Sequence, residues 1–415
     1  MLDTPMPDTP MPDTNDGQMA GPAATITGPQ TLLFATAAGI IVTNLFAPQT
    51  LVGLIGPSLG ANAASVGLVA MATLLGYAAG LFFLVPLADL SENRALILRM
   101  LIAAALAAGV AALAPSAAAL LIVLFILGAA CSAIQILVPI AASMAPPGQD
   151  GRVIGDVMSG LMVGILLARP LASLIADAWG WRAFYGLSAA ALVVLTCVLA
   201  FTLPRRRPAA KSSYGALIAS LLDLLRDEPV LRRRALTAAL VMAAFSLFWT
   251  AVALRLALPP FDLGQRGIAL FALVGAGGAV VTPVFGRAGD RGWTRSATIA
   301  CHLLLIGSMA LSAWAGSFQM GASWGPLVPM GISAVLLDIG VTGDQTLGRR
   351  AINLLQPKAR GRLNGLFVGI FFIGGAIGSM LAGIAWTWGG WPMVCAIAAA
   401  FGLVALLVDW IGGPE

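Results

Sequence analysis

The chain has 415 residues, of which 59% are hydrophobic and only 10% charged, and its mean hydropathy is +0.93. Soluble domains carry about 25% charged residues, so the composition excludes an ordinary soluble protein and indicates a chain that crosses a membrane many times. The net charge of +5 does not point to nucleic acid, because the basic residues gather in particular loops between apolar runs.

The first segment differs from the rest of the chain. It begins MLDTPMPDTPMPDTNDGQ, a repeat of Pro, Asp and Thr without Lys or Arg. A secretory signal would need a basic start and an apolar stretch. We therefore predict that residues 1–30 form a disordered cytoplasmic tail.

Apolar runs fill most of the remaining chain. A membrane-spanning helix needs about 20 mostly apolar residues, and Gly, Pro and charged residues separate the runs. Twelve spans are predicted, at 31–57, 64–88, 95–114, 117–141, 153–178, 182–203, 235–258, 266–286, 295–315, 325–347, 363–387 and 391–411. The sequence thus predicts an all-α membrane protein with twelve transmembrane helices.

The basic residues predict the orientation, because Lys and Arg accumulate in cytoplasmic loops. The chain has 23 Lys and Arg residues, and 19 of them lie in the loops after the second, fourth, sixth, eighth and tenth spans. Both termini are therefore expected in the cytoplasm, in a protein that crosses the membrane many times. The longest internal loop, 204–234, contains YGALIASLLDLLRD, whose helical apolar spacing predicts an amphipathic helix on the membrane surface.

The chain contains an internal repeat with an offset of 210 residues. Residues 151–181 match residues 361–391, with a shared Gly-Arg start and a shared Gly-Trp end. Residues 31–203 and 235–415 are therefore expected to form two pseudo-symmetric six-helix bundles, a plan typical of transporters that bind substrate at the midplane. Gly160/Gly164 and Gly374/Gly378 are expected to let helices approach closely.

One loop carries a recognisable motif. The segment GRAGDRGWTR after the eighth span resembles the G-x-x-x-D-R-x-G-R-R signature of the major facilitator superfamily, matching at Gly286, Asp290, Arg291 and Arg295. The loop after the second span, VPLADLSENR, is a weaker copy that matches at Asp89 and Arg94. The chain resembles this superfamily over residues 31–411, which implies the major facilitator fold and transport by alternating access.

Four stretches resemble, more narrowly, a bacterial drug and sugar efflux branch labelled arabinose-efflux-permease-like. They are NLFAPQTLV, IQILVPIAA, GILLARPLASLIADAWGWR, and LLDIGVTGDQ with the following ARGRLNG. The chain departs from the efflux motif G-P-x-x-G-G in the fifth span, where Ala168-Arg169-Pro170 stands. This departure weakens the inference of antiport from that motif.

Two charges lie deep inside predicted spans. An ionised side chain at the bilayer centre costs about 2.5–3.5 kcal/mol on insertion scales, so it should face the bundle interior. Arg169 is interpreted either as a substrate-binding group or as an arginine fixed to structural partners. Asp338 is interpreted either as a proton-coupling carboxylate or as a member of a fixed polar network. Asp344 is a second candidate for proton coupling.

Further polar and aromatic residues are candidates to line the central cavity, with interhelical packing as the alternative. The resemblance places the first, fourth, seventh and tenth spans around that cavity. The candidate substrate-binding residues, besides Arg169, are Asn44, Gln49, Gln135, Gln345, Phe245, Phe248, Trp249 and Arg255.

Charged residues at the cytoplasmic ends are candidates for salt bridges that close an inner gate between the halves. They are Asp89, Arg94, Arg152, Asp156, Asp290, Arg291 and Arg362. The sole histidine, His302, is expected to be packed and neutral in a peripheral helix. The sequence shows no nucleotide loop, no metal motif and no paired nucleophile and base, so neither a cofactor nor an enzymatic reaction is expected.

The sequence therefore predicts a secondary active transporter, working as a monomer, that exports a small organic molecule (a drug, sugar or metabolite) in exchange for protons. Proton-coupled uptake or facilitated diffusion of an organic anion at Arg169 is the main alternative. A channel or a non-transporting receptor is the alternative from a different class.

Overall fold

The computed structural model describes residues 26–60, 62–146, 148–207, 213–318, 324–356 and 359–412. The predicted tail at 1–30 lies almost wholly outside them. The described residues form helices and contain no strand. Among them, ten helices are long and apolar enough to cross a membrane.

The N-terminal half contains six spans, three of which consist of two helical pieces. They are α1 (Gly28–Phe46) with α2 (Pro48–Ser58), α3 (Gly67–Phe83) with the 3-10 turn η2 (Val85–Asp89), α4 (Asn93–Ala112), α5 (Ala117–Cys131) with α6 (Ile134–Ser143), α7 (Asp150–Trp179) and α8 (Trp181–Thr202). The turn η1 (Ala63–Ser65) precedes α3. Proline at Pro48 lacks a backbone N–H and interrupts the first span.

The C-terminal half repeats this plan after the linker helix α9 (Tyr214–Asp227). It contains α10 (Pro229–Leu256), α11 (Gln265–Gly275) with η3 (Ala276–Val281) and α12 (Thr282–Asp290), α13 (Thr294–Gly316), α14 (Trp324–Leu355) and α15 (Arg360–Ile411). The 52-residue α15 turns at Gly389 and at Gly390, whose φ of +61° suits glycine. The two parts of α15 complete twelve spans, which confirms the predicted fold class.

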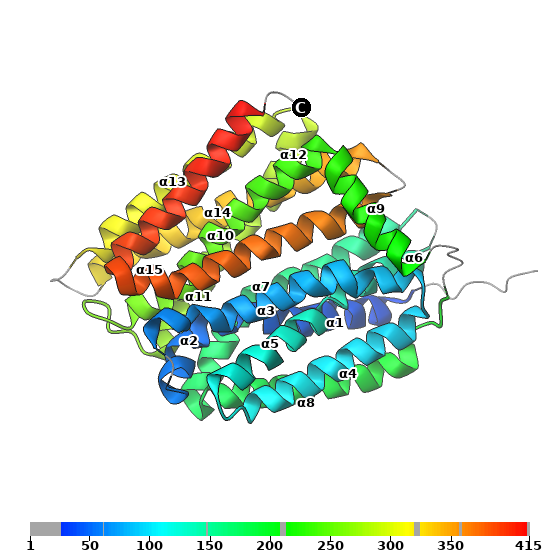
Figure 1. Ribbon diagram of the computed structural model, residues 1–415, viewed down its shortest axis with the longest axis horizontal. Helices are drawn as coiled ribbons and strands as arrows, with labels where there is room; N and C mark the ends of the chain where they lie inside the picture. The colour runs from blue at the N-terminus through cyan, green and yellow to red at the C-terminus, as the bar shows by residue number, and fades with distance from the viewer. Residues whose placement is uncertain are drawn as a thin grey trace, which may run out of the picture.

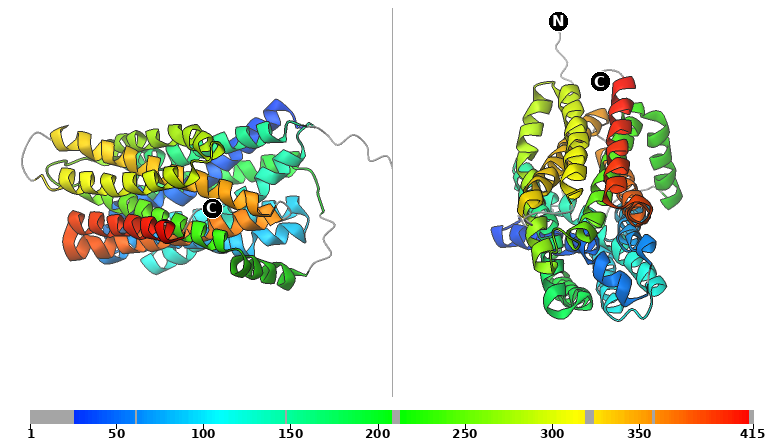
Figure 2. Two further views of the ribbon diagram at one scale, coloured as in Figure 1. Left: turned by 90° about the horizontal axis from the view of Figure 1, so that it is seen from above. Right: turned by 90° about the vertical axis from the view of Figure 1, so that its left-hand side faces the viewer.

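The two halves lie side by side, with the N-terminal half below and the C-terminal half above in Figure 1. They meet where α15 packs on α3, α11 on α7 and α10 on α2. Figure 2 shows the helices of both halves in two further views. Because the number of spans is even, α1 begins and α15 ends at the same end of the bundle, which we call the termini end; the opposite one is the far end.

Corresponding helix pairs in the two halves cross at glycine. A Cβ placed on Gly164 of α7 would lie 2.4 Å from the carbonyl oxygen of Gly39 in α1. A Cβ placed on Gly378 of α15 would lie 2.0 Å from the carbonyl oxygen of Ala243 in α10. Both distances are too short for a side chain, so glycine is required there, and the predicted close approach is confirmed.

The linker helix α9 occupies residues 214–227, the stretch predicted to be amphipathic. Its apolar face buries Leu221 and Leu224. The Tyr214 hydroxyl donates a hydrogen bond of 2.9 Å to the carbonyl oxygen of Phe83 in the N-terminal half, while α9 also packs on α10 and α15. The linker therefore contacts both halves at the termini end.

A candidate substrate and proton site between the halves

Arg169 lies inside the molecule, near the middle of α7, with only 5% of its surface exposed. Its Nε donates a hydrogen bond of 2.9 Å to Oε1 of Gln49 in α2. The Thr50 hydroxyl donates a hydrogen bond of 3.4 Å to the Arg169 carbonyl. The break at Pro48 thus places two polar side chains of the first span against Arg169. A charged side chain in an apolar surrounding needs such polar partners, because burying it without them costs free energy.

Three aromatic rings surround the Arg169 guanidinium. Its central carbon lies 4.3 Å from the ring centre of Trp249, 5.0 Å from that of Phe245 and 5.4 Å from that of Phe46. A guanidinium within about 6 Å of a ring centre gains cation–π attraction. Because Phe46 belongs to the N-terminal half and the other two rings belong to α10, the charge is held jointly by both halves.

Asp338 completes this group from α14. The Trp249 indole nitrogen donates a hydrogen bond of 3.0 Å to Oδ1 of Asp338, and the carboxylate interacts electrostatically with Arg169. A Cβ on Gly275 would lie 2.4 Å from the Trp249 ring, so glycine in α11 makes room for the indole. Opposite charges from the two halves therefore meet around one tryptophan. We call Gln49, Arg169, Trp249 and Asp338, with Phe46 and Phe245, the central group.

An aromatic path leads from the central group to Gln135. The ring of Phe372 lies 6.2 Å from that of Phe46 and 4.6 Å from that of Tyr77. The Gln135 amide donates a hydrogen bond of 3.1 Å to the Tyr77 hydroxyl. Phe46, Tyr77 and Phe372 were not predicted, because an aromatic residue within an apolar run gives no signal of the face on which it lies.

Three predicted cavity residues contact neighbours in their own half and make no contact with Arg169 that resembles those of the central group. Asn44 is fully buried and accepts a hydrogen bond of 2.7 Å from Ser188 in α8. Arg255 donates to the carbonyl oxygens of Gly316 (2.8 Å) and Pro259 (2.7 Å) at the far end. The ring centre of Phe248 lies 5.7 Å from that of Trp391 and 5.5 Å from that of Trp249. Their helices turn these three side chains toward neighbours in their own half, and a contact of any of them with substrate stays a prediction.

Asp344 also points away from the central group. Its Oδ1 lies 3.1 Å from Nε2 of His302 in α13, whereas Gln345, the next residue, is half-buried. His302 is fully buried, as predicted, but it lies between two carboxylates, those of Asp344 and Asp409. Asp409 was missed because it stands near the end of the last span, where an acidic residue is typical of a solvated terminus.

The predicted inner gate is not formed by these residues in this structure. Asp290 accepts a hydrogen bond of 3.2 Å from Arg350 of its own half, Arg94 donates to the Ala200 carbonyl, and Arg291 lies over the ring of Trp293. Each contact stays within one half because the two residues flank the same helix-to-helix loop or pack on neighbouring helices. Among the described residues, no salt bridge joins the halves through Asp89, Arg152, Asp156 or Arg362.

An ion pair between the halves lies instead at the far end. Nε of Arg266 in α11 lies 2.7 Å from Oδ2 of Asp177 in α7. The Arg266 side chain is 80% exposed, and exposed pairs contribute only about 0–1 kcal/mol. This pair therefore fastens the far end weakly.

Comparison with known proteins identifies the family. The model of the Major Facilitator Superfamily matches residues 32–343. The chain belongs to the Major Facilitator Superfamily. Among curated members, the uncharacterized transporter YgaY of Escherichia coli O157:H7 is 36% identical over 381 residues, which cover 92% of this chain and 95% of that protein. Transporter SCO4007 of Streptomyces coelicolor is 29% identical over 408 residues, covering 98% and 92%.

Solved structures of the superfamily share the fold. A mutant of the nucleoside transporter NupG superposes with a TM-score of 0.73 at 16% identity, covering 92% of this chain and 99% of the other. The D-xylose-proton symporter gives 0.73 at 13% identity, covering 93% and 97%. The human organic anion transporter TETRAN gives 0.64 at 17% identity, covering 92% and 100%.

The family and the curated relatives establish the general function. The protein is a multi-pass secondary transporter of small molecules, and it is not an enzyme.

Proposed function

We propose that the protein exports a small organic molecule (a drug, sugar or metabolite) across the bacterial inner membrane in exchange for protons, as in the efflux branch. It works as a monomer with both termini in the cytoplasm. The observation that carries this proposal is the central group, in which Arg169 of one half and Asp338 of the other meet around Trp249.

Asp338 is the proposed proton-coupling group. An ionised Asp338 balances the charge of Arg169 and accepts the Trp249 hydrogen bond. Proton binding removes that balance, so the central group changes its charge by one with each proton. A substrate that binds to the ionised carboxylate competes with the proton, and this competition is what an exchange cycle requires.

The three rings of Phe46, Phe245 and Trp249 are the proposed contact for the apolar part of the substrate. Their cation–π contacts with Arg169 are made from both halves. A rotation of one half against the other changes these contacts, as does a substrate that enters between the rings. An amphipathic molecule with one apolar face and one polar group fits this surrounding.

Proton flux in proteoliposomes tests the proposal. The purified protein is placed in vesicles with an internal pH dye, and drugs, sugars and organic anions are added in turn under an imposed potential. A compound-dependent proton flux that is lost in Asp338→Asn, and kept in the control Asp223→Asn on the exposed face of α9, is expected. Flux that survives in Asp338→Asn contradicts the assignment of Asp338.

The second candidate is proton-coupled uptake, or facilitated diffusion, of an organic anion. One nitrogen of the Arg169 guanidinium, Nη2, is buried without a hydrogen-bond partner, and a carboxylate binds a guanidinium through two such nitrogens. Protons and substrate would then move in the same direction, so the sign of the flux separates the two candidates. Movement of labelled compound without proton flux indicates facilitated diffusion.

A further inference from the structure

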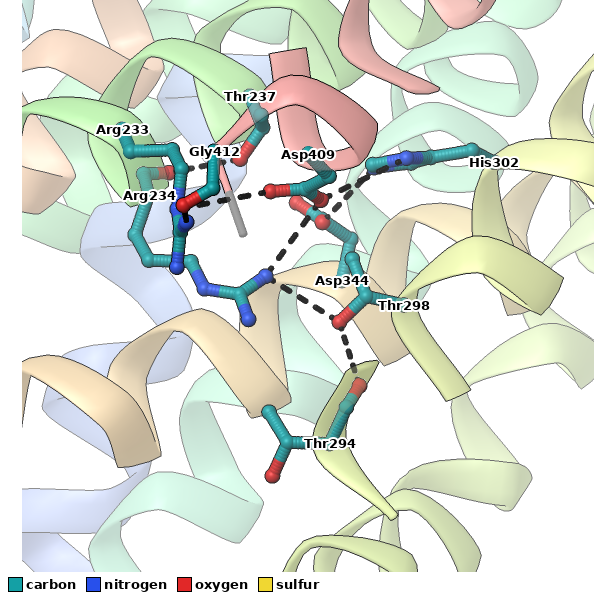
Figure 3. A network of polar contacts seen from close by, with 9 residues as sticks. All are labelled: Arg233, Arg234, Thr237, Thr294, Thr298, His302, Asp344, Asp409 and Gly412. Carbon is teal, nitrogen blue, oxygen red and sulfur yellow. Dashed lines mark hydrogen bonds and ion pairs between the residues drawn. The ribbon is translucent and has the colours of Figure 1, made fainter. Parts of the chain in front are cut away.

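A second group of charged side chains lies wholly inside the C-terminal half, near the termini end (Figure 3). His302 of α13 stands between two carboxylates: Nε2 lies 3.1 Å from Oδ1 of Asp344, and Nδ1 lies 3.7 Å from Oδ2 of Asp409. The Arg234 guanidinium of α10 lies 3.5 Å from the same Oδ2 and donates to the Thr298 hydroxyl. We call His302, Asp344, Asp409 and Arg234 the inner network.

The fold itself does not require the inner network, as the internal repeat demonstrates. The positions 210 residues before Asp344 and Asp409 are Ile134 and Leu199, and both are buried. Asp89 and Arg94 precede Asp290 and Arg295 by 201 residues, and the same offset takes His302 to the fully buried Leu101. The N-terminal half thus holds three apolar side chains where the C-terminal half holds three ionisable ones.

Apolar side chains at these positions would stabilise the folded protein at least as well as the charged ones. Replacing a buried ion pair by well-packed apolar residues is often neutral or stabilising, by about 1–4 kcal/mol. A charged cluster retained in one half only therefore points to a ligand that the cluster binds.

The geometry of the imidazole identifies that ligand as a proton. Ionised carboxylates only accept hydrogen bonds, and an imidazole donates from both nitrogens only when it is protonated. Nδ1 of His302 and Oδ2 of Asp409 lie 3.7 Å apart, and neither atom has a hydrogen-bond partner. A neutral ring carries hydrogen on one nitrogen only, so its other nitrogen would turn a lone pair toward a carboxylate. Nε2 of His302 is the partner through which Asp344 is held.

The charges of the buried groups lead to the same ligand. His302, Asp344, Asp409 and Arg234 are each at most 6% exposed. Burying two carboxylates close together is costly unless cations lie beside them, and the guanidiniums of Arg234 and Arg233 both lie beside Asp409. A proton on the imidazole gives Asp344 a cation within hydrogen-bond distance as well. The other ionisable groups near the ring are Cys301 on α13 and Arg233 on α10, whose Nε lies 4.0 Å from Oδ1 of Asp409 and which donates to the Gly412 carbonyl.

A pocket connects the inner network with the surface. The cavity, of about 550 Å³, is lined on its inner side by Arg234, Thr298 and Asp409. Asp290, Arg295 and Arg350 line it as well, and the Asp290 side chain is 73% exposed. Water in this pocket reaches Asp409, which faces the imidazole, so protons have a route from the termini end.

We propose that His302, Asp344 and Asp409 form a buried proton-binding site, separate from the central group, which holds one proton on the imidazole between the two carboxylates. The bound proton joins α13 to α14 and to the last part of α15. Loss of the proton removes the cation that lies between Asp344 and Asp409 and loosens these three helices at the termini end. The site binds its proton without substrate, so this proposal can be tested separately from the proposed exchange at Asp338.

A metal ion is the competing ligand, because the nearest ligand atoms of His302, Asp344 and Asp409 lie within 4.8 Å of one another. One feature of the network favours the proton. The two ring nitrogens face different carboxylates, whereas a metal ion binds one nitrogen and collects the carboxylates on the same side.

The single histidine of this chain makes a direct test possible. The full-length protein is labelled with ¹⁵N-histidine, placed in lipid nanodiscs and studied by NMR without substrate, with and without EDTA. At about pH 7.5, where an ordinary histidine is mostly neutral, we expect the signals of an imidazole with hydrogen on both nitrogens, unchanged by EDTA. The double variant Asp344→Asn/Asp409→Asn should lose this pattern and give a neutral ring.

The matched control is Asp290→Asn, which removes a carboxylate at the mouth of the same pocket and should leave the doubly protonated pattern intact. A neutral ring in the unmodified protein overturns the proposal and makes His302 a packing residue. A pattern that changes when EDTA is added overturns it in favour of a metal site. The spectrum of the unmodified protein decides these outcomes even if the double variant fails to fold.

Discussion

The central group and the inner network are both built from an acid, a base and a hydrogen-bonding ring, yet they differ in position and burial. The central group lies between the halves, and Asp338 there is half-buried. The inner network lies within one half, and its members are almost fully buried. A charge pair between moving bodies can be remade in each cycle, whereas a pair inside one body must persist. We infer that the first group works in transport and that the second controls the half that contributes Trp249 and Asp338 to it.

The largest expected effect separates the two groups by stability. Asp409→Ala leaves Arg234 buried beside an empty space, and removing one partner of a buried pair costs about 3–5 kcal/mol. Asp338→Asn keeps an oxygen for the Trp249 hydrogen bond and should cost far less. The free energy of unfolding in mixed detergent micelles measures both. Equal losses in the two variants would contradict the distinction between the groups.

A second variant converts the inner network into the pattern of the N-terminal half. His302→Leu, Asp344→Ile and Asp409→Leu, combined with Arg234→Met, remove every charge at once. Since whole-cluster apolar replacement is neutral or stabilising by about 1–4 kcal/mol, this variant should be at least as stable as the unmodified protein. It should retain the proton flux that depends on Asp338. Loss of that flux would mean that the two groups act as one.

The third prediction concerns the shape of the Arg169 charge. Arg169→Lys keeps the positive charge but loses the flat guanidinium that stacks on Trp249 while bonding Gln49. Cation–π contacts contribute about 0.5–2 kcal/mol, so we expect the KM of the transported compound to rise about tenfold. The matched control is Arg255→Lys at the far end, which should leave KM unchanged. A similar rise in both variants would remove Arg169 from the binding site.

The smallest effect is expected at the far end. Arg266→Ala removes the ion pair with Asp177, which contributes about 0–1 kcal/mol, so the population open at that end should rise by no more than about fivefold. Distances between spin labels on α7 and α11 measure this population. High salt should reproduce the effect in the unmodified protein. An unchanged distance distribution would show that the pair does not fasten the halves.

Sequence reasoning succeeded where a local property decides the outcome. The twelve spans and the helix at 214–227 follow from apolar length and periodicity. The glycine crossings follow from residue size, since only glycine lets two backbones approach as α1 and α7 do. The inward position of Arg169 follows from the cost of a charge in lipid. None of these predictions depends on which helices are neighbours in the folded protein.

The partners of each polar side chain were decided only by the tertiary structure. Asn44 bonds Ser188, Arg255 bonds backbone carbonyls, and Asp344 meets His302. In an almost uniformly apolar helix, periodicity does not define which face is turned inward, and a rotation of one residue step, about 100°, moves a side chain from the cavity to a neighbouring helix. By itself, therefore, the sequence determined the family, the spans and the presence of buried charges. Helix rotation and close packing decided that those charges form two separate groups.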